Sequence, residues 1–156
     1  MSPYAQDTHV SIIQSKGEIE RMIRRYGADE LYSMEGQGRM LLGFKAHGRM
    51  VRFEIQKPEP SEYQVSPAGR ARPESLTVQL AEKELRRRWR ALLLVIKAKL
   101  EAVASGIAIF EQEFFGYIVM PGGSSLYEIA KGEVAKSITH NQAPVFHLEG
   151  PSPKKT

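Results

Sequence analysis

The chain has 156 residues, which suits one domain with its own hydrophobic core. Its 42% hydrophobic and 26% charged residues are typical of a globular protein, and no apolar run reaches the ~18 residues that a membrane span needs. The absence of cysteine excludes disulfides, thiolate zinc sites and a cysteine nucleophile. The first ten residues contain no apolar signal region, so we expect a cytoplasmic protein with no membrane partner.

The first predicted helix follows an extended lead-in over residues 1–13, which leaves room for an edge strand at residues 9–13. Ser15 and Glu18 have the spacing of a capping box, which predicts Ser15 as the residue that caps the start of the helix. Gly27 is placed to end the helix. Four apolar side chains at helical spacing would form its buried stripe: Ile19, Met22, Ile23 and Tyr26.

Three short strands are predicted next, at residues 30–35, 39–46 and 49–56. The short segments between them, GQG and HG in one-letter code, have the composition of tight turns. Apolar and polar side chains alternate along the second and third strands, which predicts an antiparallel meander with one covered face. Lys45 and Arg52 fall on the outward face of this meander.

Residues 57–73 contain four prolines and two arginines, Arg70 and Arg72. The segment is too long for an ordinary connection and too polar for a core, so we expect a mobile loop. Two readings stay open for it. Either Arg70 and Arg72 close over a bound ligand, or the loop has no function.

A long amphipathic helix is predicted from Pro73 to Ser105, with Gly106 at its end. Proline suits the first turn of a helix because its missing N–H costs little there. The apolar face, which includes Trp89, is expected to pack on the meander. At 100° per residue the opposite side of this helix is cationic, and carries Lys83, Arg86, Arg87, Arg90 and Lys97.

Two shorter helices are predicted after the long one, over residues 107–120 and 125–138. The expected fold is therefore α+β, with a single domain over residues 1–140 and an irregular C-terminal tail over residues 141–156. Leu94 falls on the basic face of the long helix, so it adds apolar surface that the predicted core does not cover. Self-association and burial by the last two helices are both open explanations.

The sequence is poorly supplied for catalysis. It has only two aspartates, and Glu111 and Glu113, two residues apart, do not share a helix face. Neither Gly122-Gly123 nor residues 36–38 complete a phosphate-binding loop, so both are interpreted as turns. No two histidines form a metal-binding pair on a helix, and we expect no enzyme activity, metal or cofactor. The histidines are His9, His47, His140 and His147.

The basic surface is the strongest functional signal. The net charge is only +4, but six arginines lie within residues 70–90, and clustered arginine suits recognition of phosphate or carboxylate groups. Trp89 belongs to the apolar face, which favours a core role over base stacking. The candidate nucleic-acid or partner contacts are Arg70, Arg72, Arg86, Arg87, Arg90 and Lys97, together with Lys45 and Arg52.

The order helix, three-stranded meander, helix is similar to that of double-stranded RNA-binding domains. Those domains begin their second helix with a lysine-rich segment, and residues 73–77 (PESLT) lack it. Their function is therefore not transferred to this chain.

Several segments resemble a group of small, uncharacterised proteins encoded by tailed bacteriophages and prophages. The resemblance covers the chain up to about residue 130 and does not extend beyond His140. It implies a phage context, such as nucleic-acid transactions, host takeover or antagonism of host defence, and it supplies no catalytic residues. The segments that carry it are SIIQSK (11–16), EIE (18–20), YGA (26–28), RWRAL (88–92), IKAKLEA (96–102) and YIVMP (117–121).

The leading functional hypothesis is a non-enzymatic phage-type protein that binds DNA or RNA through the basic helix face. The alternative is a phage-encoded inhibitor of a host protein or defence system, which would dock an acidic protein surface or sequester a nucleotide signal. Both place the protein in the cytoplasm of a bacterial host.

Overall fold

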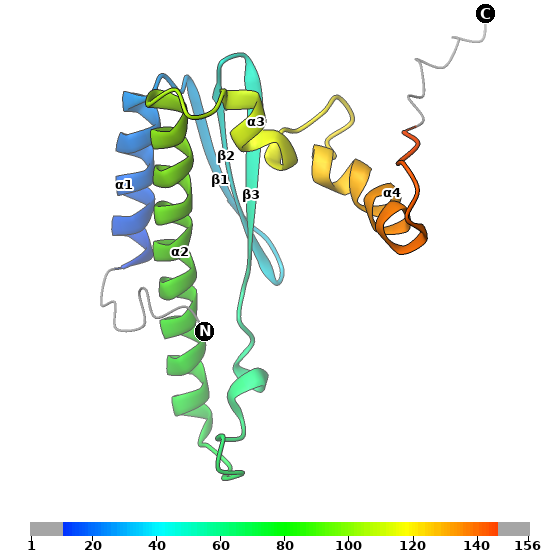
Figure 1. Cartoon of the computed structure of the whole chain (residues 1–156). Helices are drawn as coiled ribbons and strands as arrows, with labels where there is room; N and C mark the ends of the chain where they lie inside the picture. Colours follow the sequence, from blue (N-terminus) through cyan, green and yellow to red (C-terminus); the bar gives the residue numbers. More distant parts are fainter. Residues whose placement is uncertain (1–10, 147–156) are drawn as a thin grey trace, which may run out of the picture.

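Two parallel helices cover one face of a three-stranded antiparallel sheet in the computed structural model, which describes residues 11–146 (Figure 1). The order of elements confirms the predicted α+β fold. Glu18 of α1 pairs with Arg90 of α2. Tyr26, which lies further along α1, donates a hydrogen bond to Glu101, which lies further along α2. The two helices therefore run in the same direction. These elements are α1 (Ile12–Arg25), β1 (Glu30–Glu35), β2 (Arg39–Ala46), β3 (Arg49–Gln56) and α2 (Glu74–Ala104).

The sheet has the strand order β1-β2-β3, and the strand boundaries are those predicted from the alternation of side chains. His47 and Gly48 join β2 to β3 with φ angles of 50° and 70°, the left-handed conformation that a two-residue hairpin turn requires. The side chains on the helix-covered face of β2 and β3 are all buried: Met40, Leu42, Phe44, Ala46, Val51, Phe53 and Ile55.

Trp89 of α2 is fully buried at the centre of the core, which confirms its predicted packing role. Its indole N–H donates to the Met40 sulfur at 3.4 Å, so its polar group has a partner inside the core. Phe44 and Phe114 meet edge to face with ring centroids 5.9 Å apart. Burial of such large side chains is the main stabilising term for a domain of this size.

The start of α1 differs from the prediction by one turn. Ser11 is the N-cap, and its side chain forms a capping box with Gln14. Ser15 lies inside the helix, fully buried, and its hydroxyl has no hydrogen-bond partner among the described residues. Because a capping box needs only Ser or Thr followed three residues later by Glu or Gln, two adjacent candidates existed and the earlier one formed.

Residues 12 and 13 are therefore helical, not part of an edge strand, and residues 9 and 10 lie outside the described part of the chain. The predicted end of the helix is confirmed, since Gly27 has a φ of 89° immediately after the C-cap.

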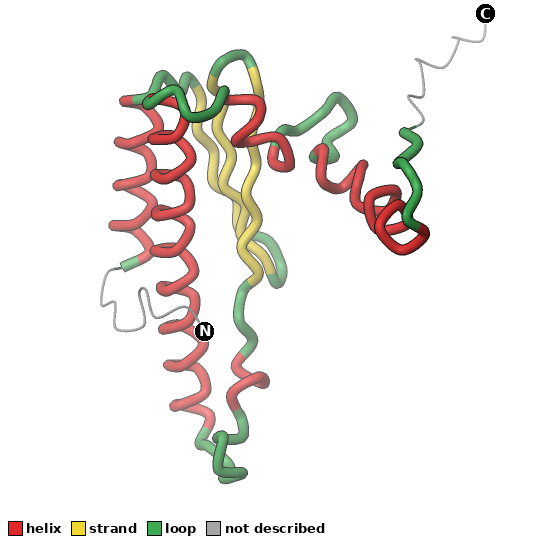
Figure 2. The backbone as a smooth tube through the Cα atoms, in the orientation of Figure 1, coloured by secondary structure: helices red, strands yellow, loops and turns green. Residues whose placement is uncertain are grey.

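Residues 57–73, which we call the finger, contain a 3-10 helix and a short bridge where composition predicted a loop, and the predicted mobility of the segment stays a prediction (Figure 2, lower end). A 3-10 helix, η1 (Pro60–Tyr63), packs on the first half of α2, and Val65 pairs with Ala71 in a short bridge. The Arg72 guanidinium donates to the carbonyls of Tyr63 and Val65 at 3.2 and 3.3 Å. These bonds satisfy two backbone carbonyl groups inside the finger.

The long helix α2 confirms the predicted element to within one residue at each end. Pro73 is its N-cap and not its first helical residue, and Gly106 follows its end with a φ of 76°. The apolar face of α2 is buried as predicted: Trp89, Leu92, Ile96 and Leu100 are buried, and Leu85 is partly buried.

Residues 107–120 do not form the predicted single helix. They form a five-residue helix, α3 (Phe110–Phe114), and a 3-10 turn, η2 (Phe115–Tyr117), followed by extended backbone. The Val119 N–H donates to the Met50 carbonyl at 2.8 Å, and Ile118 pairs with Val51 of β3. Pairing of β-branched residues with an open sheet edge therefore prevails over the helical spacing of the aromatic side chains.

The last helix, α4 (Leu126–His140), begins at Ser125, whose side chain forms a capping box with Glu128. It lies beside the edge of the sheet, as Figure 1 shows, and none of its residues is buried. Residues 141–146 are irregular, which agrees with the predicted tail, and residues 147–156 lie outside the described range.

Much of the exposed apolar surface belongs to residues 107–146. Of the 17 large hydrophobic side chains that are exposed in the described chain, 11 lie in this segment. Self-association through it stays a prediction. No helix within residues 11–146 is both long and apolar enough to cross a membrane.

Candidate nucleic-acid interface

The positive charge of the chain is concentrated on the two helices that cover the sheet. Together α1 and α2 carry eleven basic and six acidic side chains, an excess larger than the net charge of +4 of the whole chain. The rest of the molecule is therefore close to neutral or slightly acidic. An anionic ligand is attracted mainly to the helical layer.

A groove runs between α1 and α2 on the side that faces away from the sheet. Its volume is about 420 Å³. Parallel helices packed side by side leave such a groove wherever the residues at their outer contact do not meet. The groove is lined by Glu18, Arg21, Met22, Arg25 and Tyr26 of α1 and by Arg90, Leu93, Leu94 and Lys97 of α2.

Four cationic side chains border this groove, two on each helix. Arg21 and Arg25 stand one turn apart on α1, and Arg90 and Lys97 stand two turns apart on α2. Arg90 donates to Glu18 at 2.8 Å. Arg21, Arg25 and Lys97 make no ion pair or side-chain hydrogen bond with any described residue, so their charges are available to a ligand.

The floor of the groove is apolar. Leu93 is buried, and Met22 and Leu94 are partly buried between the cationic side chains. At one end the Tyr26 hydroxyl donates to the Glu101 carboxylate at 2.6 Å, and this hydrogen bond raises the pKa of Tyr26 above its ordinary value. The outward placement of Leu94, predicted from helical spacing, is thus explained by its position in this floor.

Arg86 and Arg87 have different environments although they are adjacent. Arg87 donates two hydrogen bonds to Glu84, at 2.6 and 2.7 Å, and Arg88 donates to both Glu84 and the Gln56 carbonyl. The hydrogen bond from Arg87, with that from Arg88, lowers the pKa of Glu84. Arg86 has no such partner among the described residues, and it precedes Arg90 by one helical turn. Arg86 therefore extends the cationic side of the groove, whereas Arg87 is held inside an ion-pair network.

The two arginines of the finger do not close over this groove. Arg72 holds the finger together from within, as described above. Arg70 lies beyond the start of α2, and the 17 residue-to-residue steps from Pro73 to Arg90 alone span about 25 Å at 1.5 Å per step. Only a ligand that extends along α2 reaches both Arg70 and the groove.

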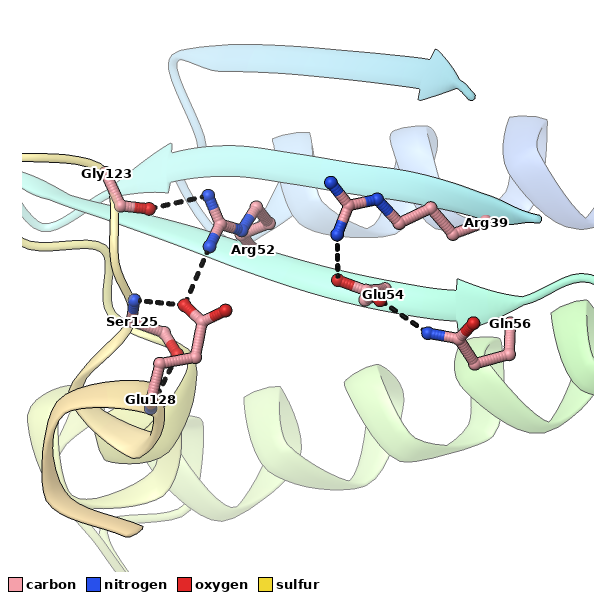
Figure 3. Close-up of polar contacts among 7 residues, drawn as sticks. All are labelled: Arg39, Arg52, Glu54, Gln56, Gly123, Ser125 and Glu128. Carbon is pink, nitrogen blue, oxygen red and sulfur yellow. Dashed lines mark hydrogen bonds and ion pairs between the residues drawn. The ribbon is translucent and has the colours of Figure 1, made fainter. Parts of the chain in front are cut away.

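Lys45 and Arg52 lie on the other face of the sheet, away from the helices. Lys45 pairs with Glu30 on the neighbouring strand at 3.1 Å. Arg52 donates to the Gly123 carbonyl at 2.8 Å and to Glu128 at 3.0 Å, which ties β3 to the start of α4 (Figure 3). The predicted set of eight cations is therefore divided between two faces of the molecule and does not form one surface.

Glu128 is held by more than Arg52. The Ser125 backbone N–H donates to it, and Glu128 in turn stands at the third position of the α4 capping box. The hydrogen bonds to Ser125 are the main cause of the lowered pKa of Glu128, and the charges of Arg52 and Lys131 lower it further.

Arg21 and Arg25 were not among the predicted contacts, although helical spacing places both on the solvent-facing side of the first helix. What sequence reasoning missed is the parallel packing of α1 on α2, which places them opposite Arg90 and Lys97. Each helix has a cationic side, and the sequence signal for this groove is the presence of such a side on both helices.

Within residues 11–146, no three metal-ligating side chains of His, Cys, Asp or Glu lie together. His47 packs on the Phe110 ring with centroids 4.8 Å apart, and the His140 ring nitrogen lies 2.9 Å from the Lys136 carbonyl. Glu111 pairs with Arg49 and Glu113 with Lys99, so the two carboxylates point to separate partners. His9 and His147 lie outside the described residues.

Comparisons of this chain with protein-family models, with curated proteins and with solved structures found no match.

Proposed function

We propose that the protein binds nucleic acid through the groove between α1 and α2, with no catalytic step. The observation that carries this proposal is the pair of cationic rows that border the groove, in which Arg21, Arg25 and Lys97 have no partner within the described chain. Side chains held in intramolecular ion pairs must lose those partners before they bind phosphate, whereas these three need only lose water.

The geometry favours contact with a phosphate backbone over recognition of bases. The cations project from both helices over an apolar floor, and the chain's only tryptophan is buried, so it cannot stack on a base. Phosphate contacts position a protein on nucleic acid without reading its sequence. We therefore expect weak sequence preference and binding that depends strongly on salt.

The direct test is fluorescence anisotropy with labelled single- and double-stranded DNA and RNA oligonucleotides at low salt. The variant Arg21→Glu with Lys97→Glu reverses one cation on each side of the groove, and we expect its affinity to fall at least about tenfold, roughly 1.4 kcal/mol. Lys45→Glu with Lys136→Glu changes the net charge equally but away from the groove, and should keep near-normal affinity.

Equal losses in the two double variants would show that net charge alone drives binding. Absence of binding by the unaltered protein to every oligonucleotide, even at low salt, would exclude the proposal.

The apolar floor favours one second candidate, an acidic host protein. An amphipathic helix with acidic edges could lay its apolar face on Met22 and Leu94 and pair its carboxylates with the bordering cations. Nucleic acid has no apolar face that requires this floor. Leu94→Asp should therefore abolish binding of such a protein, measured with the purified nuclease-treated pair, and weaken nucleic-acid binding only modestly through its added charge.

We also propose that this binding serves a phage, as the resemblance of the sequence implies. Either candidate fits that context, because a phage protein that occupies host nucleic acid or a host nucleic-acid-binding protein would act on the same processes. Sequestration of a nucleotide signal, the other alternative that the sequence left open, stays a prediction.

A further inference from the structure

The outer edge of β3 is only partly paired. The hydrogen bond from the Lys57 N–H to the Gly38 carbonyl fixes the register, so the odd-numbered residues of β3 direct their backbone groups to β2. The even-numbered residues direct theirs outward. Consistent with this alternation, the Met50 carbonyl accepts from Val119 and the Gln56 carbonyl accepts from Arg88.

Glu54 lies between these two paired positions. Its outward N–H and C=O have no hydrogen-bond partner within the described chain. The segment Ile118–Val119 occupies the position of a fourth strand opposite Met50 and Val51, but the chain leaves that position at η2. Within the described residues, no backbone group pairs with Glu54 on this side of β3.

A cleft of about 510 Å³ lies along this unpaired edge, between β3, η2 and α4. Tyr117 packs on Phe53 with ring centroids 4.3 Å apart, so its ring forms the side of the cleft nearest the core. Tyr127, with 64% of its surface exposed, and Lys131 belong to the α4 side. The residues around the cleft are Arg52, Glu54, Gly116, Tyr117, Ser125, Tyr127, Glu128 and Lys131.

Most charges around the cleft already have partners. As Figure 3 shows, Arg52 holds Glu128, and Glu54 lies between Arg39 and Gln56. Lys131 makes no ion pair or side-chain hydrogen bond with a described residue, although its charge acts on Glu128. The remaining unpaired charge of the cleft is thus positive and stands on the α4 side.

We propose that this cleft binds an extended segment of a partner protein, which adds a strand to β3 beside Glu54. Side chains of an added strand point alternately to its two faces. One set would meet Lys131 on the α4 side and the other the Tyr117 ring on the core side. The fitting segment therefore alternates acidic and apolar residues. This inference concerns a different surface from the groove and does not depend on nucleic-acid binding.

Strand addition of this kind takes its affinity from backbone hydrogen bonds and its specificity from alternate side chains. Of the outward backbone groups of β3, the Gln56 carbonyl accepts from Arg88 and the Met50 carbonyl accepts from Val119, so the backbone contribution comes from the positions between them, Arg52 and Glu54. Only a short segment fits between them. Charge pairing with Lys131 then decides which segments bind.

The test uses the full chain and a capped hexapeptide, Glu-Val-Glu-Phe-Glu-Val, followed by amide chemical shifts and by calorimetry. Glu54→Pro removes the outward N–H at an edge position, where proline is tolerated. Ser33→Pro is the matched control, since the same alternation gives Ser33 an outward N–H on the opposite edge, in β1. We expect Glu54→Pro to weaken binding at least tenfold and Ser33→Pro to leave it unchanged.

Two further comparisons keep the result interpretable if Glu54→Pro unfolds. Lys131→Glu changes only an exposed side chain of α4 and should also weaken binding at least tenfold. A peptide with alternate amides N-methylated, on the edge that faces β3, should not bind. Binding that survives N-methylation, equal binding of a peptide with Lys in place of Glu, or shift changes outside the cleft would overturn the proposal.

Discussion

At the scale of single residues, one buried side-chain polar atom in the described part of the chain has no hydrogen-bond partner there. Ser15 is fully buried in α1, and its hydroxyl has no partner within the described chain. An unsatisfied buried hydroxyl lowers the free energy of unfolding by about 1–3 kcal/mol, so Ser15 destabilises the fold locally. The same serine supplied the misleading capping signal in the sequence, because a pattern of residue types does not reveal which turn of the chain is buried.

Replacement of Ser15 by alanine should stabilise the protein. The variant Ser15→Ala removes the unsatisfied hydroxyl and introduces the residue with the highest helix propensity. We expect the free energy of unfolding, measured by urea denaturation, to rise by about 1 kcal/mol. Ser11→Ala is the informative comparison, because it removes the true N-cap and should lower stability by a similar amount. A loss of stability in Ser15→Ala would show that the hydroxyl has a partner.

The second prediction at this scale concerns Glu84, whose pKa is lowered mainly by the hydrogen bond from Arg87. A carboxyl group whose pKa is lower in the folded state stabilises that state above its unfolded pKa, and this contribution disappears as pH falls through the folded pKa. Glu84→Gln should therefore reduce the melting temperature at pH 7 and have little effect near pH 3. The same loss at both pH values would exclude an ionic role for Glu84.

At the scale of elements, the bounds of a helix or strand were predicted best where the apolar side chains followed a single period and no distant pairing intervened. The strands β2 and β3 alternate strictly, and their ends are marked by turn residues, so their bounds were correct. Residues 107–120 satisfied helical spacing, yet Ile118 and Val119 pair with β3. Local spacing could not predict this pairing, because it depends on an edge supplied by residues some 70 positions earlier in the chain.

Arg52 illustrates how an outward-facing cation can have a structural role. It connects β3 to the carbonyl of Gly123 and to Glu128 in the first turn of α4 (Figure 3). Arg52→Ala should loosen α4, which has no buried residue of its own, and leave the core intact. Hydrogen exchange should then become faster in residues 126–140 and remain unchanged in α2. Unchanged exchange in α4 would mean that Arg52 does not hold it.

At the scale of the whole molecule, the charge is divided between a cationic helical layer and a sheet face on which oppositely charged residues pair. The cationic stripe on α2 was predicted, since it follows from the 3.6-residue period. The groove itself could not be predicted, because it requires α1 to run parallel to α2 and to bring Arg21 and Arg25 opposite Arg90 and Lys97. The proposed binding surface is therefore a property of the packed pair of helices.

The most direct test of this account is the salt dependence of nucleic-acid binding. With about four phosphate contacts at the groove, the logarithm of the association constant should fall with the logarithm of salt concentration at a slope of roughly −3 to −4. Replacing both Arg21 and Lys97 by alanine should reduce that slope by about two, since each lost phosphate contact lowers it by about one. An unchanged slope in this variant, with Lys45→Ala causing the loss instead, would contradict the assignment of the groove as the binding surface.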